Sequence, residues 1–213
     1  MGFPLLPALI LLLAVVSPLA SSATILPRQS KVTLTSFSYA GTACSAGSVS
    51  STINRNGSII TFGFDLFQTY YGPSYPVAER YKNCILYLRL GYPLGSKFEI
   101  VGVTYRGQAR LDAGMNATIE TKYLISSPGA ADGSTVTRVR STSELVGEYT
   151  STDTIPTESR TASHCGLEEA YVQIRTRVKL TATSTSVSGS AYDESPFSLD
   201  YQQLHLGWSV CQD

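Results

Sequence analysis

Hydrophobic and polar residues alternate along most of this chain, with the period of two that is typical of β-strands buried on one face. The pattern is clear in Tyr171 to Thr183, where the expected inward positions are Val172, Ile174, Val178 and Leu180. It is equally clear in Ser58 to Phe67, where they are Ile60, Phe62, Phe64 and Leu66. No apolar stripe with the period of a helix extends over ten residues or more. The sequence therefore predicts an all-β protein.

Turn-forming residues separate the alternating segments. We expect strands at Lys31 to Tyr39, Ser48 to Ile53, Ser58 to Phe67, Cys84 to Leu90, Lys97 to Arg106, Ala117 to Ile125, Ser134 to Ser141, Gly147 to Thr150, Tyr171 to Thr183 and Leu199 to Cys211. In the last of these, the expected inward side chains are Leu204, Leu206, Trp208 and Val210. Many strands divided by Gly, Pro, Ser and Asn clusters are typical of an antiparallel β-sandwich or jelly roll, with a closed barrel as the alternative.

The N-terminal segment has the features of a secretory signal. Residues 1–16 are apolar, but this run is too short for a helix that crosses about 30 Å of hydrocarbon. Small residues follow, and Ser21-Ser22-Ala23 predicts cleavage before Thr24. We therefore expect a signal peptide at residues 1–23 and one secreted, extracellular β domain at residues 24–213, with no membrane attachment after cleavage.

The charge of the chain does not indicate a partner. Lys plus Arg number 16 and Asp plus Glu number 16, whereas a nucleic-acid-binding protein usually has a basic patch. The polar face of Tyr171 to Thr183 carries Arg175, Arg177 and Lys179 and is expected to be solvated. We expect no nucleic-acid partner.

Four cysteines, an even number in a chain expected to be secreted, predict two disulfides. Their spacing leaves three connectivities open, and we favour sequential pairing of Cys44 with Cys84 and of Cys165 with Cys211. Zinc is disfavoured because the chain has no Cys-x-x-Cys and only two histidines, His164 and His205. We expect no metal and no cofactor.

Two N-glycosylation sequons are present, at Asn56-Gly57-Ser58 and at Asn116-Ala117-Thr118. Asn56-Gly57 also predicts a type I′ hairpin turn, which would place Asn56 at an exposed tip. Asn116 follows the turn-like Asp112-Ala113-Gly114 and is expected to be accessible as well. The sequence thus predicts a glycoprotein.

Several short stretches occur in a characteristic order along nearly the whole mature chain. They are Tyr39-Ala40-Gly41-Thr42-Ala43-Cys44, Gly47-Ser48-Val49, Phe62-Gly63-Phe64-Asp65, Arg80-Tyr81-Lys82-Asn83-Cys84, Tyr105-Arg106-Gly107, Leu111-Asp112-Ala113-Gly114, Gly147-Glu148-Tyr149-Thr150, His164-Cys165-Gly166 and Trp208-Ser209-Val210-Cys211. The ordered set resembles the fungal secreted family called domain of unknown function 4360. This resemblance implies an extracellular, mainly β protein with two disulfides, and it implies no reaction. The closing segment departs from the family pattern, because no basic residue lies close to Cys211.

The richest aromatic patch is Tyr70-Tyr71-Gly72-Pro73-Ser74-Tyr75-Pro76, whose prolines and glycine predict an exposed connection between strands. Exposed tyrosines combine an apolar ring with a polar tip, a combination that suits sugars. Tyr70, Tyr71 and Tyr75 are therefore the candidate binding residues. The alternative is that these rings only cover the end of the sandwich.

The function favoured by the sequence is that of a non-enzymatic extracellular module, which acts by binding or as part of the cell surface or host interface. Its partner would be cell-wall polysaccharide or an extracellular protein. The alternative is a secreted carbohydrate-active enzyme with two catalytic carboxylates, in which Asp112 would pair with Asp65, Glu99 or Glu120. Such pairs act across a cleft at separations of about 5 to 5.5 Å or about 6.5 to 9.5 Å, and a sequence does not provide that distance. The simpler role for Asp112 is that of a turn residue before Ala113-Gly114.

Overall fold

The computed structural model describes residues 32–112, 114–126, 136–140, 145–165, 168–182 and 195–211. The strands in these ranges are β1 (Thr33–Gly41), β2 (Val49–Ile53), β3 (Ile59–Phe64), β4 (Gln68–Tyr71), β5 (Tyr81–Gly91), β6 (Ser96–Leu111), β7 (Met115–Ser126), β8 (Val136–Arg140), β9 (Leu145–Thr154), β10 (Glu169–Ala182), β11 (Ser195–Ser198) and β12 (Tyr201–Val210). Two single-turn 3-10 helices, η1 (Val77–Arg80) and η2 (Thr157–Ser159), lie between strands. The all-β prediction is confirmed, and the expected signal peptide at residues 1–23 lies outside the described residues.

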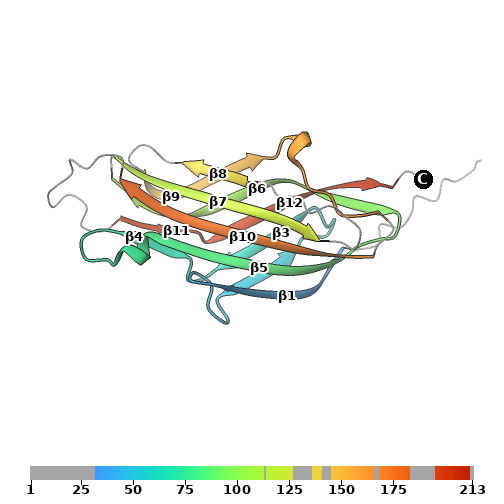
Figure 1. The fold of residues 1–213 in the computed structure, drawn as a ribbon, viewed down its shortest axis with the longest axis horizontal. Coiled ribbons are helices and arrows are strands. Elements are labelled where there is room, and N and C mark those ends of the chain that lie inside the picture. Colours follow the sequence, from blue (N-terminus) through green and yellow to red (C-terminus); the bar gives the residue numbers. More distant parts are fainter. Residues whose placement is uncertain are drawn as a thin grey trace, which may run out of the picture.

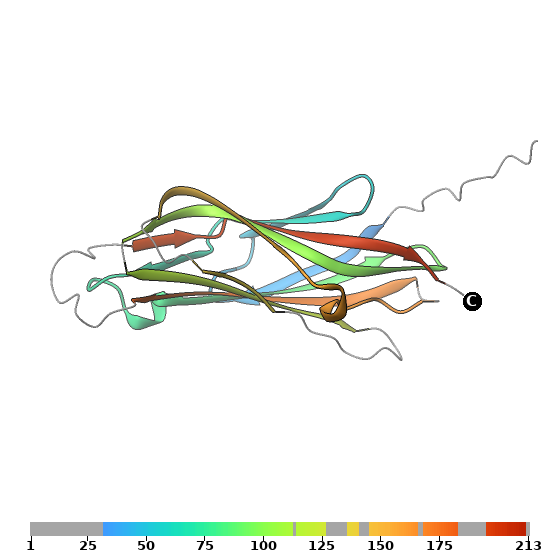
Figure 2. The same cartoon turned by 90° about the horizontal axis from the view of Figure 1, so that it is seen from above.

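The strands form two antiparallel sheets that pack face to face, as Figures 1 and 2 show. The five-stranded sheet has the order β1-β5-β10-β7-β8, and the seven-stranded sheet has the order β2-β3-β12-β6-β11-β4, with β9 also paired to β6. When β3, β5, β6, β7, β8, β9, β10 and β12 are numbered in chain order, they follow the orders 1-8-3-6 and 2-7-4-5, which define a jelly roll. The prediction of an antiparallel sandwich or jelly roll is confirmed, and the described strands do not close into one barrel.

In the seven-stranded sheet, β3 and β4 follow one line, and β11 and β12 follow another. Each line is broken by a short connection, and the two breaks lie side by side. Residues 65–67 separate β3 from β4, and residues 199–200 separate β11 from β12. At these breaks the Phe64 amide donates to the Asp200 carbonyl oxygen at 2.8 Å, and the Leu199 amide donates to the Phe67 carbonyl oxygen at 2.9 Å. Hence β4 continues the line of β3, and β11 continues the line of β12 along one edge of β6. The other edge of β6 pairs with β9.

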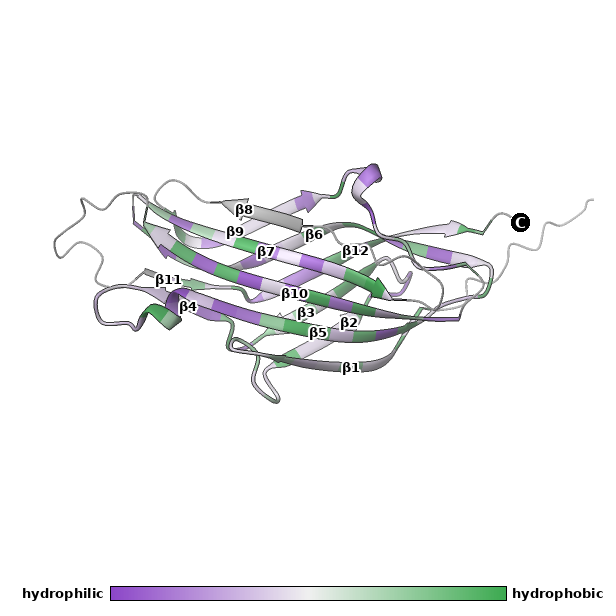
Figure 3. Cartoon of the chain, viewed as in Figure 1, coloured by the Kyte–Doolittle hydropathy of each residue, from purple (hydrophilic) through white to green (hydrophobic). Residues whose placement is uncertain are grey.

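Alternate side chains from both sheets form one hydrophobic core, and the inward pattern predicted for β10 is confirmed. Figure 3 shows this alternation of hydrophobic and hydrophilic residues along β10 and β5. The prediction was wrong for Leu66, which is 58% exposed. The reason is that β3 ends at Phe64 and the chain turns there, so that Phe67 takes the inward position. It was also wrong for Val210, which is 77% exposed at the last position of β12.

The hairpin between β2 and β3 is longer than the two-residue type I′ turn that the sequence suggested. The Asn54 amide donates to the Ile59 carbonyl oxygen, and residues 55–58 form the loop. Polar side chains hold this longer loop, because Asn54 Oδ1 accepts from the Ile59 amide and Asn56 Oδ1 accepts from Ser58. Asn56 is exposed in it, as expected.

Two disulfides join strands or connections that are far apart in the sequence. Cys44 is bonded to Cys84, and Cys165 is bonded to Cys211. This is the sequential connectivity that we favoured among the three. The Cys44–Cys84 bond joins the connection after β1 to β5 and is buried, whereas both cysteines of the other bond are half-buried near the C-terminal end. In the described part of the chain, no helix has the length and apolar character needed to span a membrane.

Candidate functional site: a groove on the seven-stranded sheet

A groove of about 430 Å³ lies on the outer face of the seven-stranded sheet. This volume is within the range of about 300–1,000 Å³ that is usual for ligand sites. We call it the Tyr70 groove, and its lining residues are Gln68, Tyr70, Gln108, Ala109, Arg110, Val146, Gly147, Pro196, Phe197, Ser198 and Asp200. They come from β4, β11, β6 and β9 and, for Asp200, from the short connection between β11 and β12. A smaller hollow of about 100 Å³ shares Gln108 and Asp200 with the groove and adds Arg106, Glu148 and Tyr201.

Side chains replace part of the strand ladder beneath the groove. β11 pairs with β6 only at Phe197 and Ala109. One residue further along, Ser198 Oγ accepts a hydrogen bond of 2.9 Å from the Gln108 amide. The Ser198 carbonyl oxygen accepts from the Tyr149 phenol at 2.8 Å. These bonds fix the groove floor where β11 and β6 lack a regular ladder.

The buried Tyr149 is held in its neutral form. Burial raises the pKa of its phenol well above the ordinary value, and the negative charge of Asp200 adds to the effect. Its ring stacks on Phe197 with centroids 4.7 Å apart. Tyr149 is therefore a structural support below the groove and a permanent hydrogen-bond donor near neutral pH.

Polar side chains of several strands face the groove and the adjoining hollow. Gln108 Nε2 donates to Glu148 Oε1 at 3.3 Å, which links β6 with β9. Tyr70 donates its hydroxyl hydrogen to Gln68 Oε1. The amides of Gln68 and Gln108 provide both donors and acceptors, Arg110 provides donors and Asp200 provides acceptors. This mixture can bind a ligand that has many hydroxyl groups.

The three tyrosines singled out from the sequence do not form one platform. Tyr70 stacks on Tyr75 with centroids 4.7 Å apart and planes inclined by 15°, and only Tyr70 of the three lines the groove. Tyr71 points to the opposite face of β4, where it packs against the hydrophobic core and under the Arg80 guanidinium, 4.2 Å from the ring centroid. Tyr70 and Tyr71 diverge because consecutive residues of a strand point to opposite faces.

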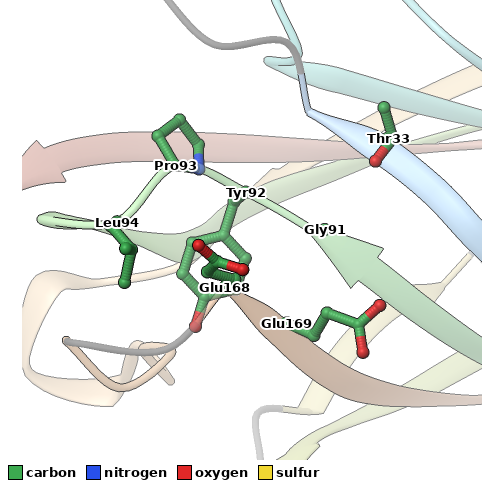
Figure 4. Close-up of a pocket in the computed structure, with 7 residues that line it drawn as sticks. All are labelled: Thr33, Gly91, Tyr92, Pro93, Leu94, Glu168 and Glu169. Carbon is green, nitrogen blue, oxygen red and sulfur yellow. The ribbon is translucent and has the colours of Figure 1, made fainter.

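A second hollow, of about 440 Å³, lies at one end of the sandwich and is shown in Figure 4. Its lining includes Tyr92, Leu94, Glu168 and Glu169. Glu169 is already engaged, since its carboxylate contacts Arg89 Nε at 3.1 Å and accepts from Thr35. In Figure 4 the carboxylate of Glu168 lies apart from that of Glu169. The hollow therefore lacks the convergent polar groups of the Tyr70 groove.

The carboxylates considered for catalysis are dispersed over the molecule. Asp65 follows β3, Glu99 on β6 is 3.8 Å from Arg160, Asp112 follows β6, and Glu120 lies on β7 of the five-stranded sheet. None of them lines the three hollows. The structure instead brings Glu148 and Asp200 to one hollow. Among the described residues no three His, Cys, Asp or Glu side chains gather as metal ligands.

Most residues that line the groove could not be recognised from the sequence. Gln68, Gln108 and Asp200 occupy ordinary polar positions, and no motif distinguishes them. Glu148 falls in the family-like stretch Gly147-Glu148-Tyr149-Thr150, but the resemblance implied no role in a site. These four residues become neighbours only because β4, β11, β6 and β9 lie side by side. Tyr70 was the one groove residue that the composition of the sequence could reveal.

The sequence matches the family described as Domain of unknown function (DUF4360) over residues 30–211. The chain belongs to this family. An uncharacterized secreted protein of Arthroderma benhamiae (strain ATCC MYA-4681 / CBS 112371) is 31% identical to this DUF4360 protein over 185 residues, which are 87% of this chain and 74% of the relative. The family resemblance noted in the sequence is thus confirmed.

Two solved structures with bound sugars show a weak similarity to this DUF4360 protein. TmCBM61 in complex with beta-1,4-galactotriose has a TM-score of 0.26 and 10% identity, over 81% of this chain and 90% of that chain. The family 11 carbohydrate-binding module from Clostridium thermocellum, in complex with a beta-1,3-1,4-mixed-linked tetrasaccharide, has a TM-score of 0.27 and 12% identity, over 86% and 97% of the two chains. TM-scores this low carry no argument about the ligand of this chain.

Proposed function

We propose that this protein is an extracellular glycan-binding module that holds a neutral polysaccharide in the Tyr70 groove. The observation that supports the proposal is the convergence of one half-buried tyrosine with two glutamines and an aspartate on a single groove of about 430 Å³. The secreted relative and the two disulfides support an extracellular location.

The groove offers a sugar both kinds of contact that it needs. Pyranose rings have apolar faces of C–H groups, and Tyr70 with Pro196 and Val146 supplies an apolar surface for them. Hydroxyl groups at the ring edge can exchange hydrogen bonds with the amides of Gln68 and Gln108. Because Tyr75 stacks on Tyr70, the ring orientation is fixed before binding, which lowers the entropic cost of holding it.

The test is binding of the secreted protein to a panel of neutral cell-wall polysaccharides, by pull-down and by calorimetry with soluble oligosaccharides. We expect Tyr70→Ala and Gln108→Ala each to weaken binding at least about tenfold, which corresponds to about 1.4 kcal/mol. Val210→Ala is the control, because Val210 is 77% exposed at the end of β12 and lines neither the groove nor the adjoining hollow. Absence of binding across the panel, or an equal loss in the control, would contradict the proposal.

A second candidate function, glycoside hydrolysis, is favoured by the presence of Glu148 and Asp200 in one hollow. Hydrolysis would use one carboxyl group as the acid and the other as the base or nucleophile. Released reducing sugar, lost in both Glu148→Gln and Asp200→Asn, would support this function. If the protein retains polysaccharide but releases no sugar, the result supports binding and contradicts hydrolysis.

A further inference from the structure

The outer face of the five-stranded sheet carries the row of positive charges that the sequence placed on one polar face, and the structure adds the side chains of the neighbouring strands. Arg175, Arg177 and Lys179 occupy every second position of β10, the middle strand of the sheet. Successive side chains on one face of a strand are about 7 Å apart, so the three cations follow one line. In Figure 1 the strands β5, β10 and β7 lie nearest to the viewer, and this face is in front.

Neighbouring strands add to this charge. Lys122 of β7 lies directly opposite Arg175, and Arg89 of β5 lies directly opposite Tyr171. Like charges placed directly opposite on a sheet are destabilising. The pair of Lys122 and Arg175 therefore lowers the stability of the fold. The positive charge is local to this face, because the formal net charge of the chain is zero.

The acidic side chains of this face are already engaged. Glu169 contacts Arg89 at 3.1 Å between Oε2 and Nε. Glu120 lies opposite Arg177, but its contact is with Lys122, at 3.9 Å between Oε1 and Nζ. In the part of the chain that the structure describes, Arg175, Arg177 and Lys179 form no ion pair. Among the described side chains, this face thus keeps an excess of three positive charges.

Three exposed tyrosines are interleaved with the cations. Tyr81 lies opposite Lys179, Tyr87 lies opposite Gln173 beside Arg175, and Tyr171 stacks under the Arg89 guanidinium at 4.8 Å. Their exposed fractions are 42%, 43% and 51%. Aromatic rings suit the apolar faces of sugars, and arginine pairs with carboxylates through two parallel hydrogen bonds.

We propose that this face, defined by Tyr81, Tyr87, Tyr171, Arg175, Arg177 and Lys179, is a second glycan-binding surface that takes an acidic polysaccharide bearing uronate carboxylates. The straight row of cations matches an extended polyanion. The tyrosines can pack against the apolar faces of sugar rings, so they favour an acidic polysaccharide over a polyanion that has no sugar rings. The inference rests on the extracellular location proposed above, but it does not depend on the Tyr70 groove, which lies on the other sheet.

The test uses the secreted protein with polygalacturonate, with methyl-esterified polygalacturonate as the uncharged polymer and with polyglutamate as the polyanion without sugar rings. We expect binding to polygalacturonate that weakens as salt is raised, no binding to the ester, and at least about tenfold weaker binding to polyglutamate. The double variant Arg175→Gln/Lys179→Gln should weaken binding to polygalacturonate at least about tenfold.

The matched control is Arg55→Gln/Lys97→Gln, which removes the same charge from the β2–β3 loop and from β6. It should leave binding to polygalacturonate unchanged, and so should Tyr70→Ala, whereas Tyr87→Ala should weaken it. Binding to polyglutamate as tight as to polygalacturonate would overturn the proposal, as would equal losses in the two double variants or no binding at low salt. Arg175→Lys/Lys179→Arg keeps both charges and one arginine at the same two positions, so it should retain most of the affinity, and a loss as large as that of Arg175→Gln/Lys179→Gln would contradict a role for the charges.

Discussion

The Tyr149 phenol donates a hydrogen bond of 2.8 Å to the Ser198 carbonyl oxygen, and Gly107 lies between the two residues. Gly107 is the register partner of Tyr149 in the β6–β9 pair. An ideal Cβ atom at position 107 would lie 2.1 Å from the Ser198 carbonyl oxygen and 3.0 Å from the Tyr149 ring. The absence of a side chain at position 107 therefore lets Tyr149 of β9 reach across β6 to the backbone of β11 beneath the Tyr70 groove.

Gly107→Ala should destabilise the protein by about 1–3 kcal/mol or more, because the clash is with backbone that cannot turn away. It should also weaken binding in the groove. The measurement is chemical denaturation with calorimetric binding. Gly207→Ala is the control, since its Cβ would meet only Val101 Cγ1, at 2.8 Å, which a change of rotamer can relieve. An equal loss of stability in the two variants would refute the explanation.

A chain of buried hydrogen bonds crosses the core between the sheets. Tyr105 donates to Thr121 Oγ1 at 2.6 Å, Thr121 and Thr176 share a bond of 3.2 Å, and Thr176 donates to Gln202 Oε1 at 2.8 Å. Burial raises the pKa of Tyr105 well above the ordinary value, with a smaller contribution from Tyr123, so Tyr105 stays a donor.

Thr176→Val should therefore lower the free energy of unfolding by about 1–3 kcal/mol, because it leaves Gln202 Oε1 without its donor and Thr121 Oγ1 with only its bond from Tyr105. Gln202→Leu added to Thr176→Val should recover part of this loss, since the unpaired polar group is then removed as well. Urea denaturation of the wild-type protein, the two single variants and the double variant gives the four free energies of a double-mutant cycle. Strictly additive losses would show that the two side chains are not coupled.

The two disulfides should differ in their resistance to reduction. Cys44 and Cys84 are 3% and 0% exposed, whereas Cys165 and Cys211 are half-buried near the end of the chain. A reductant should therefore open Cys165–Cys211 first in the folded protein, because thiol exchange requires access to sulfur. Alkylation and peptide mass spectrometry along a reductant series measure the order. Loss of either bond should cost about 2–5 kcal/mol.

His205 should make the protein less stable in mild acid. Its Nε2 lies 2.9 Å from Thr104 Oγ1, and burial lowers its pKa below the ordinary value of 6.5. The unfolded chain then takes up a proton at higher pH than the folded protein, so stability is full above about pH 6.5 and falls as the pH drops toward the folded pKa. Melting temperatures between pH 5 and pH 8 test this, and His205→Gln should flatten the profile over that interval.

The two sequons should be used unequally. Asn56 is exposed in the β2–β3 loop, whereas Asn116 is half-buried in β7 and its Oδ1 is covered without a hydrogen-bond partner among the described residues. We therefore expect a glycan on Asn56 and none on Asn116, because N-linked glycans occupy accessible surface. Intact mass spectrometry should show one glycan, which Ser58→Ala removes and Thr118→Ala does not. Two glycans on the wild-type protein would contradict this expectation.

The sequence by itself determined the local features of this protein. A period of two fixes which residues of a strand share a face, so the inward residues of β10 were readable in advance. The number of disulfides and the family were also readable, because they depend on cysteine count and on short ordered motifs. The error at Leu66 arose where a strand ends, since alternation does not mark that boundary.

The tertiary structure alone decided which strands are neighbours, and both proposed surfaces depend on that. Tyr70 and Tyr71 are adjacent in sequence but point to opposite faces, while Tyr70 and Gln108 share a groove although they come from different strands. Arg175 and Lys122 likewise face one another only because β10 pairs with β7. Contacts between residues far apart in the chain depend on strand order and register, and these are set by packing of the whole core.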